Sequence, residues 1–295
     1  MTVRIVVKME QRIRSVRYAP PAGAVGEIEV GTLAGIRERG GPREFLAPQR
    51  LDFDLLFRIG SGHAVHTVDF TGYPLEPGDV LWVRAGQVQQ WGRIAAIEGP
   101  VFLFTAAAIG AGTAELIRGA GVSTPNYWPA ASVEGPPALA LAAAAAEPRN
   151  AMGDQAIRAA ARSAALAAAL LHLIIAAPEG STHGPATREA FLWFRDEVDA
   201  RFRTRHKVAD YAARLGYSTH TLNRLARENT GMSAKEFIDE RILLEAKRLL
   251  AHGRDPVARI AEDLGFDDPS NFSKYFHQRT GLTPAAFRAR SWPAL

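Results

Sequence analysis

The stretch that decides the fold is VADYAARLGYS at residues 208–218, together with its partial copy VARIAEDLGFD at residues 257–267. The two copies align at an offset of 49 residues, which becomes 50 after one insertion, and the shared register continues to Phe237 and Phe287. In each copy, apolar residues recur at the i, i+3, i+4, i+7 spacing of one helix face. A glycine follows at 216 or 265, where a left-handed residue lets the chain turn. The pattern therefore predicts a repeated unit of a helix and a turn.

A second helix follows the turn in each unit. Ser218 in the first unit and Asp268-Pro269 in the second supply the cap and first-position proline typical of a helix start. Each unit then resembles a helix-turn-helix. The exposed face of each second helix is predicted to be polar and basic, and its candidate DNA-binding residues are His220, Asn223, Arg224 and Arg227 in the first helix and Ser270, Asn271 and Lys274 in the second. Such side chains bond base edges and phosphates. A solvated helix face is the alternative, and the matched repeat favours DNA.

The spacer between the units predicts one continuous helix. Ser233 and Glu236 have the spacing of a capping box, and an apolar stripe runs on to Leu249. A helix of about 19 residues would be about 28 Å long. Successive major-groove faces of B-DNA lie about 34 Å apart. One chain could therefore place two recognition helices in adjacent grooves.

At this point the resemblance to a family is plain. Residues from about 191 to 292, through the strings YAARLGYSTHTLNRLARENTG and IAEDLGFDDPSNFSKYFHQRTGLTPAAFR, resemble the DNA-binding domain of the AraC/XylS family of bacterial transcription regulators. The resemblance implies base-reading roles for His220, Asn223 and Arg224 and for Ser270, Asn271 and Lys274. Because Pro269 and Ser270 offer short reach, the helix at 219–229 is expected to discriminate more than the helix at 269–279.

The first 110 residues predict β structure. Short Val, Ile and Phe-rich runs recur between turn signals, which is typical of a sandwich or barrel, and they lie at residues 27–33, 52–59, 63–70, 80–84, 87–91 and 101–105. Gly60-Ser61-Gly62 is interpreted as a hairpin turn. Two helices are expected at 136–146 and at about 154–176, the second capped by Asp154, followed by a linker at 178–185.

The resemblance to the family also implies a fold class for the whole chain. It implies a multi-domain α and β protein with an N-terminal cupin-like β barrel and following helices over 1–177, and an all-α double helix-turn-helix domain over 186–295. In the family, the barrel binds an effector and the helices dimerise. The stripe Leu166, Leu170 and Leu173 is accordingly expected to form a dimer contact, with packing on the chain's own barrel as the alternative.

Candidate ligand-binding residues in the barrel are His66, Tyr73, Trp82, Gln89 and Trp91, with Phe53 as a further lining residue. A pocket is mostly apolar with a few placed polar groups, and this set fits that description. Residues 66–91 resemble the sensor domains of the family, although Gln89 stands where many members have a histidine.

Neither metal nor catalytic chemistry is predicted. His63 and His66 are three residues apart, so on a regular strand they point to opposite faces. The chain has no Cys, which excludes thiolate zinc sites and cysteine nucleophiles. We expect no enzyme activity and no cofactor. The alternatives are an effector-independent regulator whose barrel only dimerises and a cupin metalloenzyme fused to a DNA module.

Composition bears on partners and location. The net charge is +4, and residues 185–295 carry all of it, with 19 Lys and Arg against 15 Asp and Glu. The most apolar run, residues 164–177, falls short of the roughly 20 residues of a membrane-spanning helix. We therefore expect a soluble cytoplasmic homodimer without a membrane partner. The expected partners are double-stranded promoter DNA, a small-molecule effector, and RNA polymerase if the protein is an activator.

Overall fold

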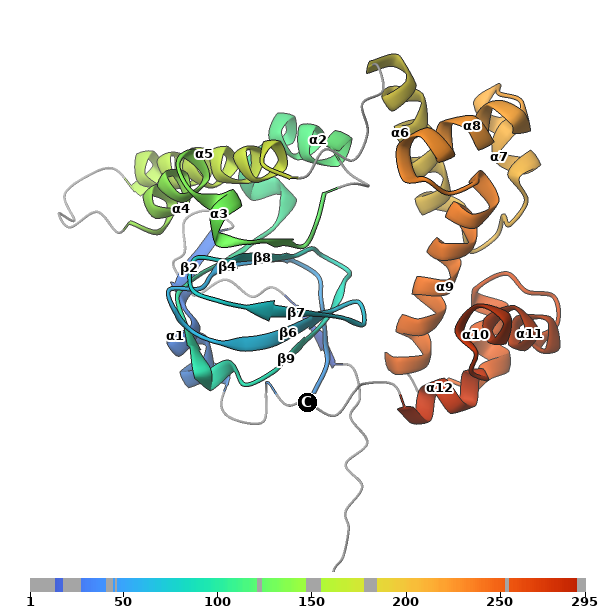
Figure 1. The fold of residues 1–295 in the computed structure, drawn as a ribbon, viewed down its shortest axis with the longest axis horizontal. Helices are drawn as coiled ribbons and strands as arrows, with labels where there is room; N and C mark the ends of the chain where they lie inside the picture. The colour runs from blue at the N-terminus through green and yellow to red at the C-terminus, as the bar shows by residue number, and fades with distance from the viewer. Residues whose placement is uncertain are drawn as a thin grey trace, which may run out of the picture.

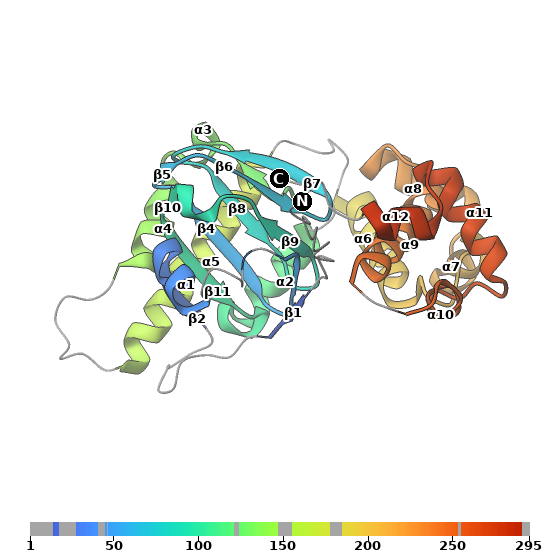
Figure 2. The ribbon, with the colours of Figure 1, turned by 90° about the horizontal axis from the view of Figure 1, so that it is seen from below.

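The computed structural model describes residues 14–17, 28–40, 45, 47–120, 124–146, 155–177, 185–252 and 255–290. A β-rich part and a helical part lie side by side, and the chain passes from the first to the second before helix α6 (Figures 1 and 2). The expected cap at Asp154 and most of the expected linker fall outside the described residues.

The β-rich part contains two five-stranded sheets. The first has the order β1-β3-β9-β6-β7, with β1 Arg14–Val16, β3 Gln49–Leu51, β9 Val88–Trp91, β6 Ala64–Val68 and β7 Thr71–Leu75. The second has the order β12-β8-β4-β11-β2, with β12 Tyr127–Trp128, β8 Val80–Val83, β4 Asp54–Arg58, β11 Pro100–Phe104 and β2 Ile28–Thr32. The described strands thus form a cupin-like sandwich, in which the two sheets do not close into a barrel, and the expected cupin-like fold class is confirmed.

The segment Gly60-Ser61-Gly62 is not a hairpin turn. It carries the chain from the second sheet to the first, and β5 (Ser61–Gly62) pairs with β10 (Ile97–Glu98) on the way. Gly62 has φ +86° and lies so close to this partner that a Cβ would stand 1.8 Å from the Ala96 carbonyl oxygen. Glycine is therefore required by both backbone conformation and space.

Two apolar layers hold the sandwich together. Along β4, Leu55 and Phe57 belong to the core between the sheets, whereas Leu56 belongs to a second core on the outer face of the second sheet. This alternation follows from the two-residue period of a strand. Both faces of this sheet are therefore buried.

Helices cover that outer face (Figure 1). They include α2 Ala111–Ala120, α3 Ala130–Val133, α4 Pro136–Ala145 and α5 Gln155–Ile175, whereas α1 Leu33–Gly40 and the short 3-10 turns η1 Ile94–Ala96 and η2 Ala106–Ile109 connect strands. The stripe Leu166, Leu170 and Leu173 is fully buried in this layer. The expectation that it forms a dimer contact is wrong, because its own domain already covers it.

Helix α5 also bears on the expected absence of a membrane segment. Residues Ala156–Ile175 are long and apolar enough to cross a bilayer by length and composition, and this span extends the predicted apolar run towards its N-terminus past Arg162 and Arg158. Its leucine face packs on the sandwich, and Trp128 donates its indole N–H to the Leu173 carbonyl at 2.7 Å. A core helix has the same composition.

The helical part has its own core. Its helices are α6 Pro185–Arg201, α7 Val208–Leu215, α8 Thr219–Thr230, α9 Ala234–His252, α10 Val257–Asp263, α11 Pro269–Thr280 and α12 Pro284–Arg290. The buried cluster runs from Phe191 to Phe276 and includes Leu222 and Leu225 of α8 and Phe272 of α11. Helix α9 joins α7 and α8 at one end to α10 and α11 at the other (Figure 1).

Candidate nucleic-acid interface and ligand pocket

The two helix-turn-helix units share the same backbone turn. After α7 and α10, Gly216 and Gly265 adopt φ of +70° and +76°. The next residue then bonds back into the first helix, Tyr217 N–H to the Ala212 carbonyl at 3.0 Å and Phe266 N–H to the Ala261 carbonyl at 2.9 Å. This is the Schellman arrangement that ends a helix at a left-handed glycine. The sequence repeat is therefore also a structural repeat.

The second helix of each unit is capped as the sequence predicts. The Ser218 hydroxyl accepts the Thr221 N–H at 3.0 Å, and the Asp268 carboxylate accepts the Ser270 N–H at 2.7 Å. Pro269 occupies the first turn of α11. These caps fix where each recognition helix begins, and hence which side chains point outward.

The spacer helix α9 sets the separation of the two units. Its 19 residues correspond to about 28 Å. At its start the Ser233 N–H donates to the Glu236 carboxylate at 2.7 Å, and the Glu236 N–H donates to the Ser233 hydroxyl at 3.2 Å. The capping box predicted from the sequence is therefore formed.

Most of the predicted DNA-binding side chains are exposed. His220, Arg224 and Arg227 lie on the outer face of α8, and Ser270, Asn271 and Lys274 lie on the outer face of α11. Arg224 bonds Glu228 one turn away, with its Nη1 at 2.9 and 3.0 Å from the two carboxylate oxygens. A surface pair of this kind contributes little to stability, so the guanidinium is available to another partner.

Asn223 differs from its neighbours. Its Nδ2 donates to the Thr219 carbonyl at 3.0 Å, and its Oδ1 accepts the Ala234 N–H at 3.1 Å. The side chain is half-buried and ties α8 to the start of α9. This placement makes it a positioning residue for the recognition helix, with its amide already satisfied.

The sandwich contains a cavity of about 310 Å³ beside the first sheet. Its wall is mainly apolar, and the lining residues are Val16, Ile36, Arg39, Gly40, Phe45, Gln49, Leu51, Phe53, Leu55, Gln89, Trp91 and Leu103. The polar groups come from α1, β3 and β9. A small pocket with an apolar wall and a few polar groups is the usual form of a small-molecule site.

Two of the five predicted ligand residues, Gln89 and Trp91, line this cavity, as does Phe53. His66 lies behind them and is 1% exposed. Its Nε2 is 3.0 Å from Gln89 Oε1, while Gln89 Nε2 donates to Gln49 Oε1 at 3.1 Å. Burial lowers the pKa of His66 to about 3, so the ring is neutral and orients the Gln89 amide.

The other two predicted residues lie elsewhere. Trp82 belongs to the core beneath the helices, where its indole donates to Asp54 Oδ1 at 2.8 Å and stacks on Trp128. Tyr73 stacks on Tyr127 with ring centroids 5.9 Å apart. Neither contributes to the cavity wall, because strand alternation turns Trp82 to the outer face of its sheet.

Sequence reasoning missed the residues that α1 and β3 bring to the cavity. Arg39, Phe45 and Gln49 all lie in the segment before residue 52. Strand β3 has only three residues, too few to show a period. Its pairing with Gln89 depends on a long-range register that the local pattern does not indicate.

Metal binding finds no support in the described ranges. No group of three or more His, Asp or Glu side chains there could hold an ion. His63 is exposed and precedes β6, whereas His66 is buried within it, so the two do not converge.

The known proteins that resemble this chain include transcription regulators with a helix-turn-helix domain. The model of a helix-turn-helix domain family matches residues 211–290. The arabinose operon regulatory protein of Escherichia coli strain K12 is 33% identical over 113 residues, and the match spans 37% of this chain and 37% of that protein. The transcriptional activator RhaR of Pectobacterium carotovorum is 24% identical over 247 residues, or 81% of this chain and 84% of that protein.

A solved structure of a transcriptional regulator with an AraC-type DNA-binding domain, from Chromobacterium violaceum, is also similar. It is 21% identical, and the match covers 38% of this chain and all of that one with a TM-score of 0.34.

Proposed function

Because the chain belongs to the AraC family through its C-terminal helix-turn-helix domain, we propose that it is a sequence-specific DNA-binding transcription regulator controlled by a small molecule. The observation that carries the proposal is the pair of matched units, each with a capped and outward-facing second helix. Chance does not easily produce two such units in one register on a single rigid spacer.

The two recognition helices have different roles in this proposal. Helix α8 offers a guanidinium at Arg224 and an imidazole at His220, which can bond purine edges in the major groove. Helix α11 offers Ser270, whose reach is short, together with Asn271 and Lys274, so it suits fewer base contacts and more phosphate contacts. Asn223 acts by holding α8 against α9.

The cavity is the proposed effector site. Its apolar wall and the amides of Gln49 and Gln89 suit a mainly apolar molecule with one hydrogen-bonding end. The similarity to the transcriptional activator RhaR spans 81% of this chain, so it extends beyond the helix-turn-helix domain into the N-terminal sandwich. The domain limits that follow are 1–177 for the sensor and 186–295 for the DNA-binding domain.

The proposed regulator has partners other than the effector. A regulator of this type works in the cytoplasm without a catalytic site, contacts promoter DNA, and contacts RNA polymerase if it activates. A homodimer would use surfaces other than the buried stripe of α5. An effector changes DNA binding only if it favours one arrangement of the two domains.

Selection from random double-stranded DNA with the full chain tests the proposal. We expect two blocks of base preference whose centres lie about one helical turn apart, as the length of α9 requires. The affinity should also fall steeply with salt, because phosphate contacts release counterions. Selection that returns no base preference would refute the proposal, and a single block would remove the two-groove arrangement.

A further inference from the structure

Strands β3 and β9 face the cavity on one side and the DNA-binding domain on the other. Gln49 and Gln89 are register partners and line the cavity. The next register pair, Arg50 and Val88, points the opposite way, as strand alternation requires. Arg50 contacts Glu245 of α9 at 3.4 Å, and Val88 packs on Ala251 of the same helix. One residue of backbone therefore separates the cavity wall from the spacer helix.

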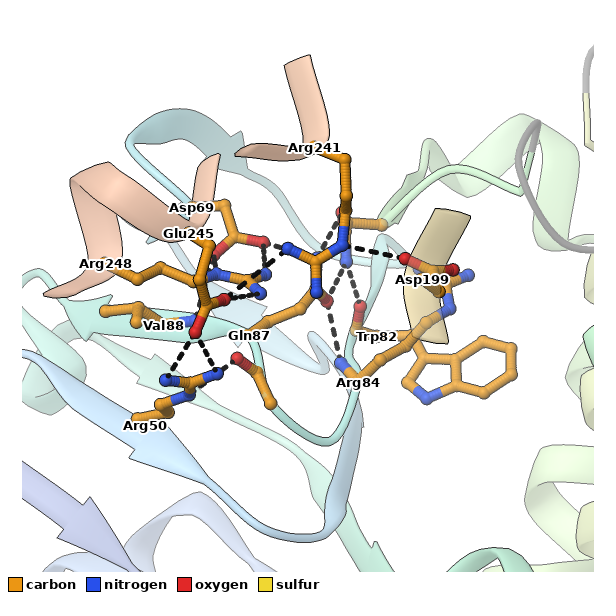
Figure 3. Close-up of polar contacts among 12 residues, drawn as sticks. Arg50, Asp69, Trp82, Arg84, Gln87, Val88, Asp199, Arg241, Glu245 and Arg248 are labelled. Carbon is orange, nitrogen blue, oxygen red and sulfur yellow. Dashed lines mark hydrogen bonds and ion pairs between the residues drawn. The ribbon is translucent and has the colours of Figure 1, made fainter. Parts of the chain in front are cut away.

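Arginines surround the Glu245 side of this contact (Figure 3). Glu245 is 1% exposed, and its carboxylate lies within 4 Å of Arg50, Arg203, Arg241 and Arg248. Burial alone would raise the pKa of Glu245, but the arginines outweigh it and hold the pKa below its ordinary value. The charge is thus kept on the buried carboxylate, where Arg50 is the partner supplied by the sandwich.

A second contact joins α9 to the hairpin between β6 and β7. Arg248 donates to both oxygens of Asp69, from Nε at 2.9 Å and from Nη2 at 2.6 Å. Both side chains are nearly buried, with exposures of 8% and 13%. Asp69 also accepts the Val88 N–H at 3.0 Å, which fixes the hairpin to β9. Bidentate charged bonds are among the strongest polar contacts in proteins.

The hairpin tip has an unusual backbone. Asp69 and Phe70 have φ of +45° and +71°, and among the described residues they are the only non-glycine residues with positive φ. The two-residue turn between Val68 and Thr71 requires positive φ at both central positions, a conformation that is unfavourable for phenylalanine. Here both residues contact the other domain, since Phe70 also packs edge-on against Phe287 of α12 at 5.7 Å. The strain lies where the domains meet.

We propose that the β6–β7 hairpin and Arg50 form a latch on helix α9, and that the occupied cavity strengthens this latch through β3 and β9. This inference rests on the proposed function, since it assigns a regulatory role to the same cavity. The latch, defined as Arg50, Asp69 and Phe70 with their partners Glu245, Arg248 and Phe287, holds the helix that sets the spacing of the two recognition helices.

The direction of the coupling follows from how β3 is held. It pairs with β1 through three residues and with β9 through only two, so the ladder that joins it to β9 is short. The Gln49–Gln89 bond and the cavity contacts of Leu51 supply further restraint. A molecule that fills the cavity adds contacts to these side chains and so fixes Arg50 opposite Glu245. Charged contacts at Glu245 and Asp69 lie beside apolar contacts at Val88 and Phe70 in the interface between the domains, and interfaces between domains of one chain permit movement.

Distance measurement on the full chain tests the latch. Because the sequence has no Cys, Ala95→Cys and Ala213→Cys give one labelled site in each domain at exposed positions. The parent should show one narrow distance distribution. Arg248→Gln, and Asp69→Asn, which suits the positive φ, should each lower the ratio of docked to released chains by about tenfold or more, because a buried charge loses its partner.

The control is Arg259→Gln, which removes the same charge from an exposed pair on α10. Its distance distribution should match that of the parent. The double variant of Asp69→Asn and Arg248→Gln should be no worse than either single change, because the two groups act as one pair. A broad distribution in the parent, or latch variants that behave like the control, would overturn the latch.

The coupling to the cavity is tested by a change that does not touch α9. Gln89→Leu breaks the bond to Gln49 and should lower the docked-to-released ratio by about threefold or more. Leu139→Ala changes an exposed residue of α4 outside the cavity lining and should leave the ratio unchanged. Equal ratios for these two variants would overturn the coupling. Failure of the proposed function would instead appear as absence of base preference in DNA selection, with these ratios unaffected.

Discussion

Acid should destabilise the sandwich through His66. The ring is 1% exposed and lies edge-on to Trp91 at 4.5 Å. Its Nε2 faces the Gln89 carbonyl oxygen, and its Nδ1 has no hydrogen-bond partner among the described residues. A second proton would therefore enter a buried site without an acceptor. Burial accordingly lowers the pKa of His66 from 6.5 to about 3.

The sign and size of the effect follow from proton linkage. Below about pH 6.5 the unfolded chain binds a proton at this residue, whereas the folded chain does not until about pH 3. The free energy of unfolding therefore decreases as the pH falls through this window. Between about pH 8 and about pH 5 the loss from His66 is about 2 kcal/mol, taking about 1.4 kcal/mol for each pH unit below the unfolded pKa.

Urea unfolding followed by tryptophan fluorescence measures this loss, because Trp82, Trp91 and Trp128 all lie in the sandwich core. His66→Gln should lose about 2 kcal/mol less than the parent between the two pH values. Exposed His63→Gln should keep the acid sensitivity of the parent. Equal losses in the parent and His66→Gln would refute the assignment of a neutral, poorly accommodated ring.

Protonation of Asp54 changes the free energy of unfolding in the opposite direction. Its contribution cancels when the parent is compared with His66→Gln. Burial raises its pKa to about 6, although bonding to the Trp82 indole opposes the shift. The folded chain then holds this proton more tightly than the unfolded chain, so acid stabilises the sandwich between about pH 6 and pH 4. Because Asp54 is present in every variant, the difference between parent and His66→Gln isolates the imidazole.

Three further changes test the DNA-binding face and the fold. Arg224→Ala should reduce the discrimination between bases at one position of the site by about 1–3 kcal/mol, whereas Arg227→Ala should weaken binding to all sequences alike. If site selection with Arg224→Ala returns the base preferences of the parent at every position, Arg224 contacts phosphate instead. The fragment 185–295, whose core is complete without the sandwich, should bind DNA in a salt-dependent way, and a folded fragment that shows none would contradict the domain assignment. Asp79→Ala should lower the free energy of unfolding in urea by about 2–4 kcal/mol, because the Glu76 and Ala130 N–H groups and the Tyr127 hydroxyl lose their acceptor. An unchanged urea midpoint would exclude this role of Asp79.

The helical domain was predictable because its signals are local. The glycine turn, the Ser218 and Asp268 caps and the capping box at Ser233 each depend on residues within a few positions of one another. Repetition then doubles the information, since the same turn bonds recur at Tyr217 and Phe266.

The sandwich was predictable only in part, because β1, β3, β7 and β12 were not expected and the pairing of the strands was not indicated. All six expected strands are present, yet which strands pair depends on contacts far apart in sequence. The four residues of β8, including Trp82, are all buried, so no apolar alternation tells which face meets the cavity and which meets the helices. Trp91 and Trp82 therefore could not be distinguished from sequence, although one lines the cavity and the other does not.

The same limit applies to the contact between the domains. Glu245 and Arg248 fit the polar side of an ordinary solvated helix, and Asp69 fits an ordinary turn. Only the folded chain brings Arg248 to Asp69 across 179 positions. Long-range charge pairs have no local sequence pattern, because the register that joins them is set by the packing of both domains.

A charge placed in the leucine stripe of α5 tests whether the stripe packs on its own domain or on a second chain. Leu170 has no exposed surface and packs with Leu166, Leu173 and Trp128. Leu170→Glu would place a carboxylate in this apolar layer, which costs several kcal/mol unless the group is neutralised or escapes to water. We expect a lower melting temperature or insoluble protein, with no clean conversion of a folded dimer to a folded monomer. Ile157→Glu on the same helix is the control, since Ile157 is 68% exposed and should tolerate the charge. Sedimentation and thermal unfolding of both variants separate the two roles. A folded, monomeric Leu170→Glu beside a dimeric parent would show that the stripe opens to a second chain after all.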